Sequence, residues 1–203
     1  MAKMMFSDAV GLTDAVIRGV KTSTCRDEVL GRFSAVRFMS KDVLREQSNS
    51  EGFISDRFYG YSSAKGWELV IPKFSVGQRV AVAQAYKDID FGDIYAYHLG
   101  ELKASAGWSN KMFVKSELMP HVIEITEVRV VKVRSLGMTD ILTEGVEVHD
   151  QFELCYRHRT QGLRVFDSSE YRFAWGSLLR HIGCGLLWDA DSYVFQYKFK
   201  LVK

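Results

Sequence analysis

A chain of 203 residues with 47% hydrophobic and 26% charged side chains has the composition of a folded globular protein, and not of a disordered one. Its formal net charge of +2 excludes a strong overall field for nucleic acid, so such binding would depend on local basic patches. The three cysteines, Cys25, Cys155 and Cys184, lack Cys-x-x-Cys spacing, and the five histidines lack metal-ligand spacing. With no apolar run long enough to cross a bilayer, we expect a cytoplasmic protein that has no membrane span, disulfide framework, metal or cofactor.

The N-terminal part of the chain predicts a short strand over residues 3–6 and then a helix that carries Val16 and Ile17. Thr13 can cap this helix, and Gly19 stands where a helix ends in a left-handed residue. A polar segment without helical pattern follows. Taken alone, this segment indicates a solvated basic turn.

Two predicted insertions surround a pair of strands in the next part of the chain. Residues 41–66 are polar and predict a loop. Its aromatic side chains would either stack on bases or hold the loop against the core: Phe53, Phe58, Tyr59 and Tyr61. Strands over residues 67–71 and 79–86 follow, joined by a turn at 74–78. Residues 87–110 form the second insertion.

Residues 121–134 have the strongest strand pattern in the chain, because β-branched residues alternate there with charged ones. The phase of this alternation slips near residues 126–128. A bulge or a bend at a barrel corner would explain the slip.

A short helix is predicted after that strand, with Thr139 as its cap and Gly145 at its end. Glu144 then lies at the C-terminal edge, where a carboxylate meets the negative end of the helix dipole and favours a neighbouring cation. This gives a physical reason to pair Glu144 with Lys21. A solvated helix glutamate is the alternative.

A third insertion, residues 147–190, begins with a predicted hairpin over 153–166. The turn of this hairpin is the most basic short segment of the chain and supplies candidate RNA contacts, although an ordinary exposed hairpin is equally consistent with it: Arg157, Arg159 and Arg164. A helix then begins at Ser168 or Ser169 and ends near Gly183. Its expected buried side chains are Phe173, Leu178 and Leu179.

The last predicted element is a strand over residues 193–202 that closes the barrel. Its alternation places four side chains inward: Phe195, Tyr197, Phe199 and Leu201. Three polar side chains are then expected to point outward: Gln196, Lys198 and Lys200.

The order of a helix, the motif Gly-x-Lys-Thr-x-Thr-x-Arg and, after a long gap, a Val-Gly turn into a strand resembles the ASCH family. Domains of that family are similar to the PUA-like β-barrels that bind RNA. The resemblance implies an α+β fold, a PUA-like mixed β-barrel with short flanking helices and large loop insertions, in a single domain over residues 1–203. It covers less than half of the chain, namely residues 5–28, 74–86, 121–146 and 193–202.

Within that family, the motif looks most like that of small bacterial N4-acetylcytidine amidohydrolases, whose proposed catalytic group is a lysine, a threonine and a glutamate. Lys21 and Thr24 match the first two, and Glu144 is the best match to the third. The resemblance therefore implies removal of the acetyl group from N4-acetylcytidine or a related modified nucleoside, with Arg26 as a further substrate contact. A non-catalytic RNA-binding module and a ribonuclease-like activity, in which Lys21 and Arg26 serve phosphate chemistry, are the alternatives.

Amide hydrolysis requires a nucleophile, a base and a partner for the developing oxyanion. Thr24 supplies a hydroxyl, and Lys21 can act as the base if burial lowers its pKa. An ionised Glu144 beside Lys21 would oppose that shift, so the sequence leaves open which of the two is the base. Cys25 separates Thr24 from Arg26, where the family favours an apolar or basic residue, and is either a reactive thiol or a buried small hydrophobe.

Overall fold

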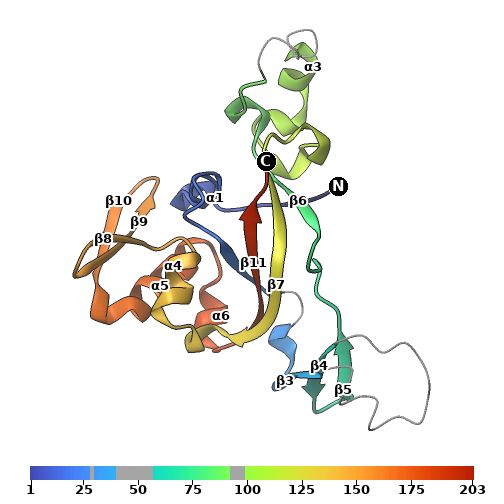
Figure 1. Ribbon diagram of the computed structural model, residues 1–203, viewed down its shortest axis with the longest axis vertical. Coiled ribbons are helices and arrows are strands. Elements are labelled where there is room, and N and C mark those ends of the chain that lie inside the picture. The colour runs from blue at the N-terminus through green and yellow to red at the C-terminus, as the bar shows by residue number, and fades with distance from the viewer. Residues whose placement is uncertain (28–29, 40–56, 92–98) are drawn as a thin grey trace.

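The computed structural model describes residues 1–27, 30–39, 57–91 and 99–203, and these ranges form a mixed α+β protein with eleven strands in three sheets (Figure 1). The α+β class is therefore confirmed. The central sheet has the order β1-β6-β7-β11-β2, in which only the β1–β6 pair is parallel. Its strands are Ala2–Met4, Arg79–Val82, Val122–Lys132, Tyr193–Leu201 and Ser23–Arg26, given in that order. Among the described residues no pairing joins β1 to β2, so closure into a PUA-like barrel stays a prediction.

The long antiparallel pair of β7 and β11 forms the centre of this sheet, and the predicted phase slip is a real irregularity of that pair. Lys198 lies opposite Glu127 and Phe199 opposite Ile125, which leaves Thr126 without a partner in the register. The extra residue bulges and changes the face to which the following side chains point.

The alternation predicted for β11 holds with one exception on each face of the strand, and Lys198 and Lys200 point outward as expected. Phe195, Tyr197 and Phe199 are buried as expected. Leu201, predicted to point inward, is 38% exposed, and Gln196, predicted to point outward, is fully buried. The strand is covered on both faces near its middle, so a period of two does not separate core from solvent there.

Two smaller antiparallel sheets lie at the lower end and at one side of the central sheet (Figure 1). The first contains β3 (Ala35–Met39), β4 (Arg57–Ser62) and β5 (Gly66–Val70). The second contains β8 (Glu147–Asp150) and the predicted hairpin, which is confirmed as β9 (Glu153–His158) and β10 (Gly162–Asp167). Residues 41–56, with Phe53, lie outside the described residues.

The helices are short and surround the sheets. Within the described ranges, the α-helices are α1 (Leu12–Ile17), α3 (Leu99–Ala104), α4 (Met138–Thr143), α5 (Tyr171–His181) and α6 (Gly185–Asp189). Single 3-10 turns occur at Asp8–Val10, Leu30–Arg32, Tyr86–Asp88, Ala106–Trp108, Lys111–Phe113, Ser116–Leu118, Val133–Ser135 and Ser168–Glu170. Helix α3 and its neighbouring turns pack on a second small core that includes Tyr86, so the strand predicted over 79–86 ends early, at Val82.

Both threonine caps predicted from the sequence are wrong. Gly11, in the left-handed region at φ 67°, precedes α1, and Gly137 precedes α4. Thr13 lies inside its helix and donates a hydrogen bond to the Asp8 carboxylate (2.5 Å). The predicted burial of Phe173 is wrong as well, because this side chain is 67% exposed on α5.

Candidate functional site

The site begins where α1 ends and turns the chain into the edge strand β2. Gly19 adopts φ 73°, as the sequence predicted for a helix terminus, and the backbone N–H groups of Val20 and Lys21 both donate to the Ala15 carbonyl oxygen (2.9 Å each). This tight turn brings Lys21 inward, and its side chain is only 2% exposed.

The end of α4 supplies the second half of the site. Glu144 is the C-terminal cap of α4, and Gly145 follows it at φ 102°, a conformation that favours glycine. The Thr22 N–H donates to the Thr143 carbonyl oxygen (2.9 Å), which ties this helix end to the start of β2. Segments that are about 120 residues apart in the sequence are thereby held side by side.

Lys21 and Glu144 form a buried ion pair. The Lys21 Nζ lies 3.1 Å from the Glu144 Oε2 and 2.6 Å from the Glu144 carbonyl oxygen. Both side chains are 2% exposed. The predicted contact between them is confirmed, and the ammonium group also satisfies a carbonyl at the negative end of the helix.

The Glu144 carboxylate accepts further hydrogen bonds, and three come from β2. Ser23 Oγ donates to Oε1 (2.8 Å), the Cys25 N–H to Oε2 (3.2 Å) and the Cys25 Sγ to Oε1 (3.3 Å). Gln196 Nε2 on β11 lies 3.4 Å from Oε1. Ser23 and Cys25 alternate along β2 onto the same face, so the strand period itself aims both at the carboxylate.

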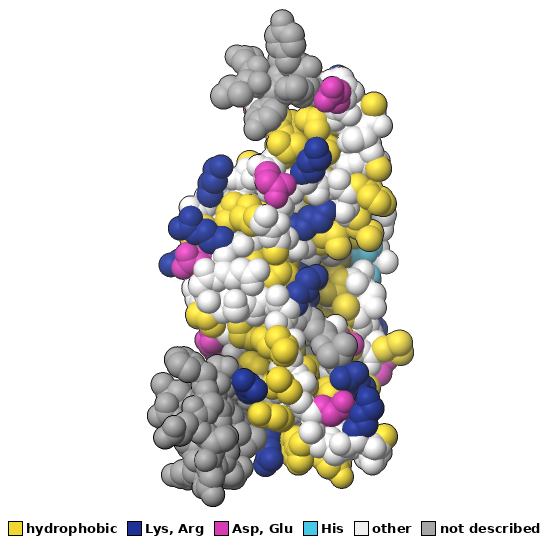
Figure 2. All heavy atoms as spheres, turned by 90° about the vertical axis from the view of Figure 1, so that its right-hand side faces the viewer, with side chains coloured by type: hydrophobic (Ala, Val, Ile, Leu, Met, Phe, Trp, Pro, Cys, Tyr) yellow, Lys and Arg dark blue, Asp and Glu magenta, His cyan; other side chains and the backbone are white. Residues whose placement is uncertain are grey.

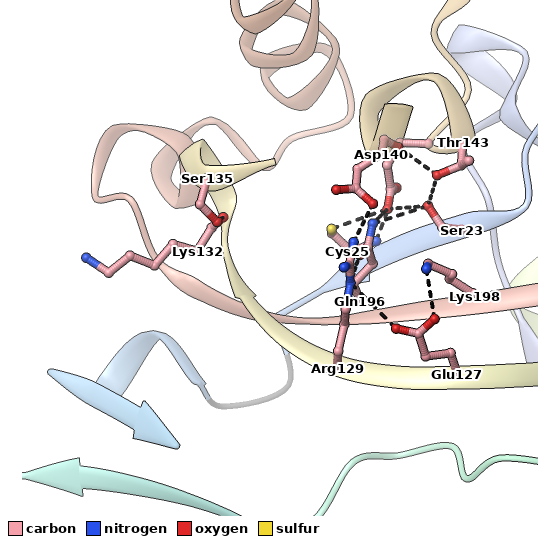
Figure 3. A network of polar contacts seen from close by, with 11 residues as sticks. Ser23, Cys25, Glu127, Arg129, Lys132, Ser135, Asp140, Thr143, Gln196 and Lys198 are labelled. Carbon is pink, nitrogen blue, oxygen red and sulfur yellow. Dashed lines mark hydrogen bonds and ion pairs between the residues drawn. The ribbon is translucent and has the colours of Figure 1, made fainter. Parts of the chain in front are cut away.

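A chain of polar contacts continues from Gln196 through Arg129 to Asp140 on α4 (Figure 3). Arg129 on β7 donates to Gln196 Oε1 (2.5 Å) and also pairs with Asp140 in the first turn of α4. Thr143 Oγ1 and Ser23 Oγ are 2.8 Å apart. The network thus joins β2, β7, β11 and α4, and it fixes the Gln196 amide with its nitrogen toward Glu144.

Burial and charge act in opposite directions on this pair. Burial lowers the pKa of Lys21, and this outweighs the adjacent Glu144 carboxylate, which raises it. Burial raises the pKa of Glu144, but the contacts with Lys21, Ser23 and Cys25 more than compensate, so the Glu144 pKa falls below its ordinary value of 4.5. The carboxylate is therefore ionised at neutral pH, and the lysine releases its proton more readily than a solvated lysine does.

Cys25 is a thiol in this environment. Burial, together with the neighbouring Glu144 carboxylate, raises the Cys25 pKa well above its ordinary value of 9.0. A nucleophilic cysteine needs a lowered pKa, which supplies the thiolate. The geometry favours a thiol that donates a hydrogen bond to Glu144 over the reactive alternative left open by the sequence.

An open cavity of about 420 Å³ lies against the ion pair. Its polar wall contains Lys21, Thr24, Cys25, Arg26 and Glu144. Most of the remaining lining is apolar and comes mainly from the buried stripe of α5, with residues of α6 and of the segment between β1 and α1: Trp175, Leu178, Leu179, Ile182, Leu187, Met5 and Phe6. A cavity of this size, mostly apolar with a few convergent polar groups, is typical of a small-molecule site.

Thr24 and Arg26, the other two residues of the predicted motif, also line this cavity. Thr24 is 5% exposed, and its hydroxyl makes no hydrogen bond within the described part of the chain. Arg26 donates to the Met5 carbonyl oxygen (2.5 Å), and its guanidinium carbon lies 5.4 Å from the centre of the Phe6 ring. These contacts make Arg26 a support of the cavity rim.

The arginines of the β9–β10 hairpin are not part of this cavity. Arg157 and Arg159 line a separate hollow of about 520 Å³ together with Lys87 and Lys111. Arg164 lies exposed on β10. The structure thus separates the predicted site residues into a buried group around Glu144 and an exposed basic group on the hairpin.

Sequence reasoning missed three polar residues of the site: Ser23, Gln196 and Arg129. Ser23 lies within the motif, and its place two residues before Cys25 on one strand face was an available signal. Gln196 and Arg129 lie on strands whose alternation of apolar and polar residues predicts that their polar side chains point to solvent. Only the register that places Gln196 opposite both Arg129 and Cys25 reveals their role.

Comparison of the chain with protein-family models, curated proteins and solved structures gave no match. Within the described residues, no group of three or more His, Cys, Asp or Glu side chains is arranged to hold a metal ion. None of the helices in those same ranges is long and apolar enough to cross a membrane.

Proposed function

We propose that the chain is an ASCH-type amidohydrolase with a PUA-like barrel, and that it removes the acetyl group from N4-acetylcytidine or a related modified nucleoside. The observation that carries the proposal is the buried Lys21–Glu144 pair in the wall of a cavity that Thr24 also lines. Burying two charges is costly, and a buried pair adds little to stability compared with apolar residues of similar size. A buried pair that faces a cavity is better explained by chemistry.

The cavity suits an acylated nucleobase. Its volume of about 420 Å³ lies within the range of small-ligand sites. Trp175 and the leucines of α5 supply apolar lining against which a base can pack, while Lys21, Thr24 and Glu144 supply the groups that amide hydrolysis needs. A long polynucleotide would need an open groove at this point instead.

The surroundings of Glu144 favour one assignment of roles. The carboxylate accepts hydrogen bonds from Lys21, Ser23 and Cys25, and its lowered pKa makes it a weak base. Lys21 is the better proton acceptor, because burial lowers its pKa and so makes its neutral amine more accessible than that of a solvated lysine. Glu144 is then the positioning residue that holds the lysine in place, and Lys21 transfers the proton.

The proposed reaction has two halves. In molecules in which Lys21 has released its proton, the Thr24 hydroxyl attacks the acetyl carbonyl carbon, and the hydroxyl proton passes to the Lys21 amine. The resulting Lys21 ammonium faces the oxyanion and then gives the proton to the leaving N4 amino group as the amide bond breaks. Lys21 then takes a proton from a water molecule that attacks the acetyl ester, and it returns this proton to the Thr24 oxygen as the ester bond breaks. The products are cytidine and acetic acid, which releases its proton to solvent as acetate.

Three features of the chain are consistent with action in the reducing cytoplasm, which we include in the proposal. All three cysteines are free thiols, namely Cys25, Cys155 and Cys184. Burial contributes to a raised pKa in each of them, which slows oxidation. The hydrogen bond from the Cys25 Sγ to Glu144 also requires the reduced form.

The test is chromatographic detection of cytidine after incubation of the purified protein with N4-acetylcytidine. Thr24→Val removes the hydroxyl but keeps the shape of the side chain, and we expect at least about a hundredfold loss of kcat. The matched control is Thr22→Val, because Thr22 lies two residues away and does not line the cavity. We expect the control to keep wild-type turnover.

Glu144→Gln tests the assignment of roles without removing the side chain. A positioning carboxylate predicts a lower kcat and a changed pH profile, because the charge that holds Lys21 is lost. Full activity in Thr24→Val would overturn the threonine nucleophile. An inactive wild type, shown by circular dichroism to be folded, would overturn the proposed substrate.

A further inference from the structure

We propose that the outer face of the β3–β5 sheet binds single-stranded RNA by stacking its bases on exposed aromatic rings. This aromatic face is defined by Arg37 on β3, Tyr59 and Tyr61 on β4, and Trp67 and Leu69 on β5. It lies apart from the cavity, at the lower end of the molecule, where hydrophobic and basic side chains are mixed on the surface (Figures 1 and 2).

The strand register places these residues on one side of the sheet. Tyr61 lies directly opposite Trp67, and Tyr59 lies between Arg37 and Leu69. Because side chains of a strand alternate, the residues between them point to the other side. That other side packs on the core through Phe58 and Val70, which are buried, and the Phe58 ring lies 5.2 Å from the Phe195 ring. The aromatic face is therefore not needed for the core.

Two rings of this face, those of Tyr61 and Trp67, are exposed and contact each other in a tilted arrangement. Tyr61 is 39% and Trp67 is 43% exposed, and their ring centres lie 5.4 Å apart. The Arg37 guanidinium carbon lies 4.1 Å from the centre of the Trp67 ring. A guanidinium that stacks on an indole leaves its second flat side available, and RNA bases stack on such planes as well as on aromatic rings.

The charge of the sheet complements a phosphate backbone. Arg37 and Arg57 share the outer side of the sheet by the register. Among the described residues of its three strands, Glu68 is the only acid, and it lies on the opposite side, 3.6 Å from Lys65. Cationic side chains beside exposed aromatic rings are the combination by which proteins bind unpaired strands of nucleic acid.

Two tyrosine hydroxyls on the same face favour RNA over DNA. Tyr59 and Tyr61 lie two residues apart on β4, so both phenols face the bound strand. A phenol can donate to or accept from a ribose 2′-hydroxyl, and that group distinguishes the two nucleic acids. Duplex RNA buries its base faces and does not fit this mode.

Fluorescence anisotropy with a labelled 12-nucleotide oligouridylate tests the proposal on the full chain, across a salt series. We expect binding that Trp67→Ala weakens by about tenfold or more, because one stacking ring is lost. Arg37→Ala should also weaken binding and should reduce the salt slope by about 0.7. Phe173→Ala is the matched control, since Phe173 is an even more exposed ring (67%) on α5, outside the aromatic face.

Three results would overturn the proposal: no binding by the wild type, equal loss in Phe173→Ala, or equal affinity for duplex RNA. Equal affinity for the matching deoxyoligonucleotide would overturn the assignment to RNA. Tyr61→Ala gives a second, independent variant if Trp67→Ala is poorly folded. Turnover of free N4-acetylcytidine should not change in Trp67→Ala, so this test is separate from that of the cavity.

Discussion

Two regions of the molecule carry charged side chains in opposite surroundings. The cavity wall of β2 and α4 buries its charges, whereas the outer face of β3–β5 leaves its charges exposed. In the cavity wall, the charges of Lys21 and Glu144 are removed from water, and the charged atoms of these two side chains have named hydrogen-bond partners. On the aromatic face, Arg37 and Trp67 contact each other while both remain accessible. The first arrangement acts as a unit, because the loss of one member leaves a buried charge. Members of the second can be removed one at a time.

The largest expected effect follows from breaking the buried pair. Lys21→Ala or Glu144→Ala should lower the free energy of unfolding by about 3–5 kcal/mol, because the remaining charge stays buried without its counter-ion. Urea denaturation measures this change. The control is the exposed pair of Arg180 and Asp189, whose side chains are 54% and 58% exposed, and Arg180→Ala should cost about 1 kcal/mol or less. Similar losses in both pairs would contradict the comparison.

Gly145→Ala should destabilise the cavity wall by about 1–3 kcal/mol, measured by the same denaturation. Gly145 has φ 102°, and an added Cβ would lie 2.7 Å from the Leu12 Cδ2. Gly100→Ala in α3 is the control, because nothing lies within 4 Å of its Cβ position. There the helix propensity of alanine should stabilise by about 0.5–1 kcal/mol. An unchanged free energy of unfolding in Gly145→Ala would show that the end of α4 is not rigidly fixed.

Acid should lower the free energy of unfolding of the wild type more than that of Glu144→Gln, which lacks the Glu144 charge. The Glu144 pKa is lowered on folding, so the unfolded chain binds more protons below about pH 4.5. The stabilisation is present above pH 4.5 and is lost as the pH falls through the lowered pKa. Urea midpoints between pH 3 and 7 should therefore fall more steeply for the wild type than for Glu144→Gln. Parallel curves would contradict the pKa shift.

The smallest expected effect comes from the aromatic face. Trp67→Ala should cost about 1 kcal/mol or less in the free energy of unfolding, because Trp67 is 43% exposed. Trp175→Ala should cost about 3–5 kcal/mol, since Trp175 is 2% exposed and donates to the Val133 carbonyl oxygen (3.2 Å). Thermal unfolding of the two variants makes the comparison. A large loss in Trp67→Ala would mean that this face stabilises the fold.

Local patterns predicted much of the fold where one principle acted alone. The bulge near Thr126 followed from the broken alternation, and the helix ends at Gly19 and Gly145 followed from the left-handed conformation that glycine permits. The contact of Lys21 with Glu144 followed from the helix dipole and from the family resemblance. In each case the type and position of a residue in the sequence were enough to predict the local structure.

Predictions failed where tertiary packing overrode a local preference. Thr13 and Thr139 are good caps by type, but glycines take the residue before each helix. Phe173 was expected in the core because it is apolar. The buried stripe of α5 contains Trp175 and Leu178, and Phe173 falls on the opposite side of a 3.6-residue period.

The central claim is that Lys21 and Thr24 act together on an acyl amide, and one measurement tests it most directly. Wild-type protein is mixed with N4-acetylcytidine, and cytidine and acetate are followed together, with intact-protein mass recorded at early times. The account predicts equal amounts of both products and a transient gain of one acetyl group that is absent in Thr24→Val. Turnover without any acetyl adduct, unchanged by Thr24→Val, would contradict it.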